Sequence, residues 1–241
     1  MKSISILLIV LVALAFSGLN TKNDTAKNSE IVKIQRQVAN YESVEFSGWF
    51  DVEIVNGQEG TLILSGDENV LKSIVTKVKK GTLYLGVKKG IRFIPKWKKQ
   101  TVKIIVPVKD IQKINVSGSG NLTVRDTLKA ERFTALLSGS GNLQLEIQAL
   151  SLQTSVSGKS KLLVKGKTRN FMVMASGSCE IDAYDLHTYN ASTNLSGSAD
   201  IRVAPVHNLK AMLSGSGTVY YRGEPENVEV QSSGSGKVLK E

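Results

Sequence analysis

The second half of the chain repeats a short serine- and glycine-rich unit at a nearly fixed interval. Aligned on its first serine, successive units lie 21, 19, 19, 20, 18 and 19 residues apart. Such a period is typical of stacked-coil proteins, because each unit buries its apolar side only against its neighbours. The seven units begin at Ser117, Ser138, Ser157, Ser176, Ser196, Ser214 and Ser233.

The residues around each unit alternate between apolar and polar, which is the pattern of a half-buried strand. If Val116 and Leu122 point inward, then Gly118 and Gly120 point inward as well, and the two serines point outward. Inward positions without side chains let the strand bend and let the next coil approach closely. The unit is therefore predicted to be a corner, with outward serines stacked in ladders.

A 19-residue unit with two strands and two bends fits one coil of a right-handed parallel β-solenoid. Equivalent residues then stack about 4.8 Å apart, which explains why each column keeps its character. The alternative is an antiparallel β-meander or prism, which favours Asn-Gly or Asp-Gly turns. The repeat region contains neither dipeptide. We therefore expect an all-β protein with a solenoid of about 19-residue coils over residues 114–241.

The first 113 residues divide into three segments. Residues 1–18 combine Lys2 with a short apolar run and a small-residue cleavage pattern, as in a secretory signal peptide. Residues 19–40 are polar and form an expected tether, whereas residues 41–113 are expected to be a β-rich cap on the solenoid. In this cap we predict hairpins at Asn56-Gly57 and at Lys80-Gly81, and a helical turn near residues 67–74.

The net charge of +10 is concentrated in one region, since residues 70–113 contain 13 Lys or Arg and one acid. Basic residues interleaved with aromatic ones can bind a polysaccharide or an anionic envelope surface. The alternative is a solvated hairpin tip whose lysines discourage edge pairing. Nucleic acid is not an expected partner of an exported protein. The candidate binding residues are Lys88, Lys89, Arg92, Phe93, Lys96, Trp97, Lys98 and Lys99.

An acidic cluster is a second candidate site, because stacking places Glu180 and Asp200 in one outward column, with Asp182 beside Arg202. Three such carboxylates could hold Ca²⁺ or supply the acid and base of a glycan-cleaving enzyme. The alternative is a solvated face on which Asp182 pairs with Arg202.

Other chemistry is not indicated by the sequence. Cys179 is the only cysteine, so it cannot form an internal disulfide, and it stands where other units have Gly or Ala. His187 and His207 lack zinc-site spacing, and no nucleophile elbow or nucleotide-binding motif is present. We expect no cofactor and no resident metal.

The SGSG units, together with the closing "YYRGEPENVEVQSSGSGKV", resemble the bacterial family described as putative auto-transporter adhesin, head GIN domain. The resemblance runs from Tyr41 to the C-terminus, although the tripeptide Gly-Ile-Asn itself is absent. It implies a right-handed β-helix-like fold and export to a bacterial envelope, and it implies no established activity.

We therefore expect a non-catalytic, exported, adhesin-like protein that binds a cell-envelope or extracellular polymer. A carbohydrate-active enzyme on the β-helix face and a structural envelope module without a small ligand are the alternatives. The protein would be periplasmic, outer-membrane-associated or secreted, without a transmembrane span in its mature chain. The sequence leaves its oligomeric state open.

Overall fold

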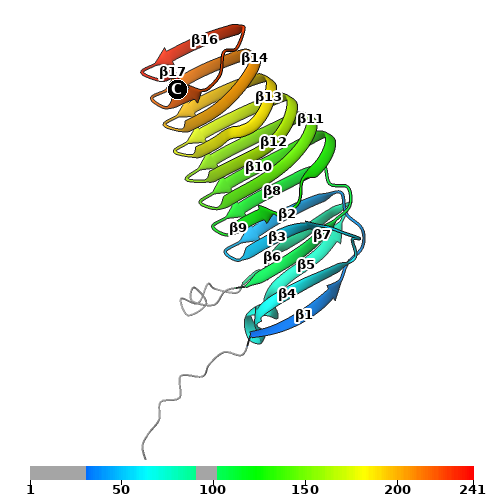
Figure 1. Ribbon diagram of the computed structural model, residues 1–241. Helices are drawn as coiled ribbons and strands as arrows, with labels where there is room; N and C mark the ends of the chain where they lie inside the picture. The colour runs from blue at the N-terminus through cyan, green and yellow to red at the C-terminus, as the bar shows by residue number, and fades with distance from the viewer. Residues whose placement is uncertain (1–30, 91–101) are drawn as a thin grey trace, which may run out of the picture.

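The structure is a computed structural model that describes residues 31–90 and 102–241. Its strands form a single stack that runs from the N-terminal elements at one end to the C-terminus at the other (Figure 1). One short helix accompanies the strands in the described part of the chain, and this helix is too short to cross a membrane. The predicted all-β class is confirmed.

The repeat region is a parallel β-solenoid. Ser157 pairs with Ser176, and Ser176 pairs in turn with Ser196, so equivalent residues of successive coils are direct neighbours. The parallel ladders confirm the solenoid, and the antiparallel alternative is wrong. The long strands of this region are β10 (Leu128–Gly139), β11 (Asn142–Gly158), β12 (Lys161–Gly177), β13 (Glu180–Gly197) and β14 (Asp200–Gly215).

Parallel stacking also includes strands that precede residue 114. Ser47 and Gly48 pair with Ser117 and Gly118, so the stretch "FSGWFDVEIV" forms a coil directly against the first SGSG unit. A further pair of strands lies against that coil on its other side. The strands of these coils are β2 (Ser43–Gly48), β3 (Asp51–Asn56), β6 (Thr82–Val87), β7 (Lys103–Val108), β8 (Lys113–Gly118) and β9 (Asn121–Val124).

Antiparallel strands and a one-turn helix close the N-terminal end of the stack. The Asp67 side chain accepts hydrogen bonds from the N–H groups of Asn69 and Val70, and so caps the helix that we expected near residues 67–74. Arg36 donates to the carbonyls of Leu71 and Ile74, both at 2.6 Å. The elements of this end are β1 (Ile31–Gln37), β4 (Thr61–Asp67), α1 (Glu68–Leu71) and β5 (Ile74–Lys79).

One of the two predicted hairpins is wrong. Strands β3 and β4, on either side of Asn56-Gly57, both pair with β7 and not with each other. The second edge of β3 is taken by β9, because the parallel coils continue there. The second hairpin is confirmed, since β5 and β6 are antiparallel and the φ angles of Lys80 and Gly81 are +49° and +70°.

The SGSG corner differs from expectation at its first glycine. Gly120 is buried as predicted, but Gly118 is exposed, with φ at +107°. A Cβ atom on Gly118 would lie 2.4 Å from the carbonyl oxygen of Gly48 in the adjacent coil. The first glycine is thus required by its left-handed backbone and by the neighbouring coil, not by an inward orientation.

Backbone hydrogen bonds, more than serine hydroxyls, connect successive corners. The Ser140 N–H donates to the Gly118 carbonyl at 2.8 Å, and the Ser198 N–H donates to the Gly177 carbonyl at the same distance. The predicted hydroxyl ladder is represented by Ser198 and Ser216, whose Oγ atoms are 3.3 Å apart. Each corner is therefore fixed by its contact with the preceding one.

The inward columns form one continuous apolar core. Cys179 belongs to it with 3% exposure, and burial raises the pKa of its thiol. It therefore fills the small-residue position that we expected. In this core, the column of residues directly before the first serine of each unit contains Val116, Leu137, Val156, Ala175, Leu195 and Leu213, all buried.

The strands of the last coils are β15 (Thr218–Tyr221), β16 (Asn227–Gly234) and β17 (Lys237–Lys240).

The corner geometry predicts that Gly139→Ala destabilises the solenoid more than Gly81→Ala. Both glycines have positive φ, so each alanine carries about 1–3 kcal/mol of backbone strain. Only at Gly139 would the new Cβ also approach a carbonyl oxygen, to 2.5 Å, whereas nothing lies within 4 Å at Gly81. Urea unfolding followed by circular dichroism measures both losses, and equal losses would contradict this role for the corner.

Candidate functional site

The basic candidate site lies only partly within the described residues. Lys88 and Lys89 are exposed directly after β6, and the Lys88 N–H donates to the Ser73 carbonyl at 2.9 Å. This bond fixes the start of the basic segment beside β5. The other candidate residues, Arg92, Phe93, Lys96, Trp97, Lys98 and Lys99, lie outside the described residues.

The acidic candidates occupy the predicted register, but their ion pairing is different. Glu180 is aligned with Asp200, and Asp182 with Arg202. The expected Asp182–Arg202 ion pair is replaced by one from Glu180, whose Oε1 lies 3.0 Å from Arg202 Nη1. The shorter Asp182 side chain accepts from its own strand instead, at the Tyr184 N–H, 3.2 Å away. Glu180 also contacts Lys161 at 3.1 Å.

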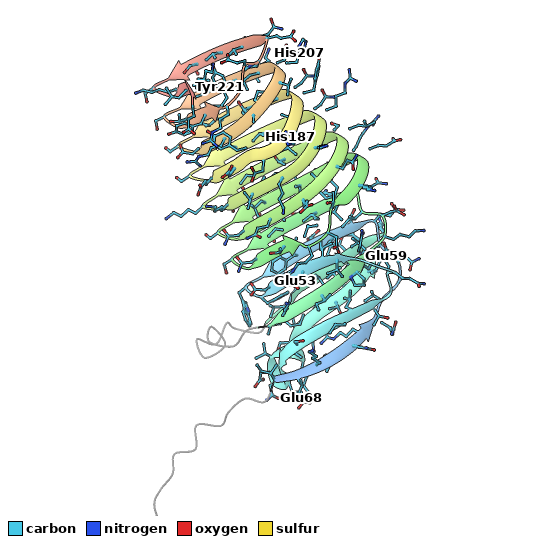
Figure 2. All side chains as sticks on the ribbon, viewed as in Figure 1. Glu53, Glu59, Glu68, His187, His207 and Tyr221 are labelled. Atoms are coloured by element: carbon cyan, nitrogen blue, oxygen red, sulfur yellow. The ribbon has the colours of Figure 1, made fainter. Side chains whose placement is uncertain are left out.

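A surface of stacked tyrosine and arginine side chains adjoins these carboxylates, and the sequence reasoning missed it. The Arg222 guanidinium lies 3.9 Å from the ring centroid of Tyr184, and Arg202 lies 5.3 Å from that of Tyr220. We call Tyr184, Arg202, Tyr220 and Arg222 the Tyr–Arg surface. It lies near the C-terminal end, where Figure 2 labels the adjacent Tyr221.

The residue spacing contains the signal for this surface. Asp182, Arg202 and Tyr220 are each the sixth residue after the first serine of their unit, and Tyr184 and Arg222 are each the eighth. By the period-two rule these positions share the outward face with Glu180. The same column rule, applied to the sixth and eighth residues after the serine, places these side chains together on one face.

Glu241 connects the Tyr–Arg surface to the last coil. The Tyr184 hydroxyl donates to Glu241 Oε2 at 2.8 Å, and Arg222 reaches the same oxygen at 3.2 Å. Burial, followed by the bond to Glu241, raises the pKa of Tyr184 to about 12. The phenol is therefore held in its neutral, donating form, and cation–π contacts and hydrogen bonds join residues from several coils.

An asparagine ladder follows the opposite corner of the coils. The side-chain amide of Asn190 donates to Asn170 at 2.9 Å, that of Asn208 donates to Asn190 at 2.7 Å, and that of Asn227 donates to Asn208 at 3.0 Å. The Thr188 hydroxyl donates to the Asn190 carbonyl and so supports the same bend. Amides can form such a ladder because each one both donates and accepts.

The two histidines do not come together as a metal site. His207 stacks on Tyr189, with 4.7 Å between ring centroids, and its Nδ1 lies 2.8 Å from Glu226. His187 lies on an earlier coil (Figure 2). Within residues 31–90 and 102–241, no group of three or more His, Cys, Asp or Glu side chains is placed to hold a metal ion.

A polar hollow of about 850 Å³ opens at the N-terminal end between loops that include Tyr41, Gly57 and Lys109. Glu59 binds two of these loops, because its carboxylate accepts from the N–H groups of Tyr41, at 3.0 Å, and Lys109, at 3.3 Å. The Tyr41 hydroxyl donates to the Pro107 carbonyl. Burial and the nearby Glu59 raise the pKa of Tyr41. The Glu59 carboxylate thus holds these two loops together.

The asparagine ladder makes a prediction about stability. Asn190→Ala removes two ladder bonds, each contributing about 0.5–1.5 kcal/mol, and leaves two amides without this partner. Asn194→Ala is the matched control, since Asn194 lies on the same strand without a side-chain hydrogen bond among the described residues. Urea unfolding should show a clear loss for Asn190→Ala and almost none for the control. Equal stabilities would argue against the ladder.

The raised pKa of Tyr184 makes a prediction about alkaline pH. The folded protein holds the phenol proton more tightly than the unfolded chain, so its contribution is complete below pH 10 and is lost as pH rises toward 12. Tyr184→Phe removes this contribution. The stability difference between wild type and variant should therefore shrink between pH 10 and pH 12, as measured by urea unfolding. A constant difference would contradict the assignment.

Three solved structures of bacterial proteins have the same fold. A putative adhesin from Bacteroides fragilis aligns with a TM-score of 0.81 at 18% identity, over 88% of this chain and 97% of its own. A putative adhesin from Parabacteroides distasonis gives 0.70 at 21% identity, covering 89% and 98%. A putative lipid binding protein from the same species gives 0.68 at 24% identity, with the same coverage. These likenesses establish the fold.

No protein with a curated description matches this sequence. The family model described as "Putative auto-transporter adhesin, head GIN domain" matches residues 40–225, which is most of the chain and includes the coils against the first SGSG unit. The parallel register of those coils and the repeated corners agree with that match. The chain therefore belongs to the putative auto-transporter adhesin, head GIN domain family.

Proposed function

We propose that this protein is an exported, non-catalytic, adhesin-like solenoid that binds a cell-envelope or extracellular polymer along its side. The observation that carries the proposal is the arrangement of outward side chains in columns that continue from coil to coil, as on the Tyr–Arg surface. Neighbouring coils are about 4.8 Å apart. A rigid face of this kind offers repeated contacts to an extended polymer.

The basic segment is the proposed first contact with an anionic polymer or surface. Lys88 and Lys89 are exposed where this segment begins, and the sequence continues it through Arg92, Lys96 and Trp97 to Lys99. Positive charge steers association with anionic partners and weakens as salt rises. The Tyr–Arg surface would add aromatic and guanidinium contacts to hydroxylated polymers.

The contacts of Glu180 favour binding over glycan hydrolysis. Both of its carboxylate oxygens contact cations, from Arg202 and Lys161, and Asp182 accepts a bond from its own strand. An inverting or retaining pair needs two carboxyl groups free to face a scissile bond. The enzymatic alternative has a direct test, because depolymerisation that disappears in Asp200→Asn would identify a catalytic carboxylate and overturn the proposal.

Binding of the purified chain to acidic glycans, neutral glycans and anionic liposomes across a salt series tests the polymer proposal. The double variant Lys88→Glu, Lys89→Glu should weaken binding to anionic partners about tenfold or more, since a lysine near an anionic surface contributes about 1 kcal/mol. The control Lys129→Glu, Arg132→Glu makes the same change in net charge at exposed positions elsewhere.

Three outcomes would decide the matter. Salt-sensitive binding lost only in the Lys88, Lys89 variant supports the basic contact. Salt-insensitive binding to neutral glycans, lost in Tyr220→Ala, would move the contact to the Tyr–Arg surface. Absence of binding to every probe would overturn the polymer proposal in favour of a structural envelope module.

A further inference from the structure

The C-terminal coil exposes residues of the core columns. Val228 pairs with Leu209, and Val230 pairs with Ala211, so both valines continue inward columns. Leu209 and Ala211 are 1% and 0% exposed, whereas Val228 and Val230 are 43% and 47% exposed. The hydrophobic columns therefore reach this end of the stack without a cover among the described residues.

The backbone edge of the same coil is also open. The ladder pairs of β16 all lie on β14, and those of β17 all lie on β15. Figure 1 shows these strands at the end of the stack, with the C-terminus beside them. Unpaired N–H and C=O groups beside exposed valines are a template for pairing with another strand.

The opposite end of the stack does not offer an equivalent surface. There β4 and β5 run antiparallel to the coils, and Arg36 satisfies the carbonyls of Leu71 and Ile74. The outermost strand, β1, pairs only with β4, but its free edge carries Lys33 and Arg36, and charges of this kind discourage edge pairing. A head-to-tail contact would therefore oppose an open apolar edge to a charged one.

We propose that the C-terminal coil docks against the C-terminal coil of a second copy of this chain. A two-fold axis between the copies makes each edge strand antiparallel to its own counterpart, which is the geometry of a closed dimer. If the two β17 strands pair with each other and the two-fold axis passes beside Leu239, then Lys237 of one copy lies opposite Glu241 of the other. In this register the two Leu239 side chains contact each other. Leu239 is 43% exposed in the single chain, so this contact covers it.

This arrangement is independent of polymer binding. The docking residues lie in the last coil, whereas Lys88 and Lys89 lie in the coil formed by β6 and β7. A dimer joined at the C-terminal ends would place the Lys88 and Lys89 of each copy toward its two far ends, suited to two contacts with one surface or polymer.

Sedimentation velocity of the purified full chain over a wide concentration range tests the docking. We expect a concentration-dependent species of twice 26.1 kDa. Val230→Lys should weaken dimerisation at least about tenfold, because a charge would enter the apolar contact. Met172→Lys is the matched control, since Met172 is 48% exposed on a central coil. A wild type that stays monomeric, or equal effects of the two variants, would overturn the proposal.

Cross-linking tests the orientation without relying on a charged variant. Under mild oxidation, Leu239→Cys should form a covalent dimer, because residue 239 faces itself across the two-fold axis. Met172→Cys should stay monomeric, and the native Cys179 is buried and does not interfere. Covalent dimers of Met172→Cys with none of Leu239→Cys would overturn the docking, and this result is separate from any loss of polymer binding.

Discussion

The close approach of one coil's backbone to the next is the constraint on which the rest of the molecule depends. At the corner, a Cβ atom on Gly118 or Gly139 would lie within 2.5 Å of a carbonyl oxygen in the adjacent coil. Only glycine permits this contact in a left-handed backbone. Once the corners are in contact, the flanking strands are held in parallel register, and the serine of one unit must lie on the serine of the next.

Register then determines the chemistry of both sides of each strand. Inward columns stack apolar side chains into one core, and outward columns become rows of polar groups, such as the four asparagines beginning at Asn170. The Tyr–Arg surface arises in the same way, from residues far apart in sequence that occupy nearby columns. A binding surface on such a protein is thus formed by columns of side chains from successive coils, so a single substitution changes only one position in a column.

Much of this architecture could be predicted from the repeat. The repeat period, the inward orientation of Val116 and Leu122, and the need for a small residue at Cys179 all follow from spacing and alternation that are visible along the chain. The predictions that were wrong concern places where two strands compete for one strand edge, or two carboxylates compete for one arginine. Strand β3 pairs with β7 and β9 and leaves no edge for β4, and the longer side chain of Glu180 takes the arginine that Asp182 was expected to bind. Local patterns contain no information about such competition.

The sequence by itself determined the repeat length, the corner residues and the alignment of like with like, because each of these is a relation between residues at fixed spacing. Only the tertiary structure decided that β2 and β3 join the stack against the first SGSG unit, and that antiparallel strands cover the coils at the N-terminal end while Val228 and Val230 stay exposed at the other. The physical reason is that edge pairing and burial depend on which strand arrives beside which, and this is settled by the packing of the whole stack.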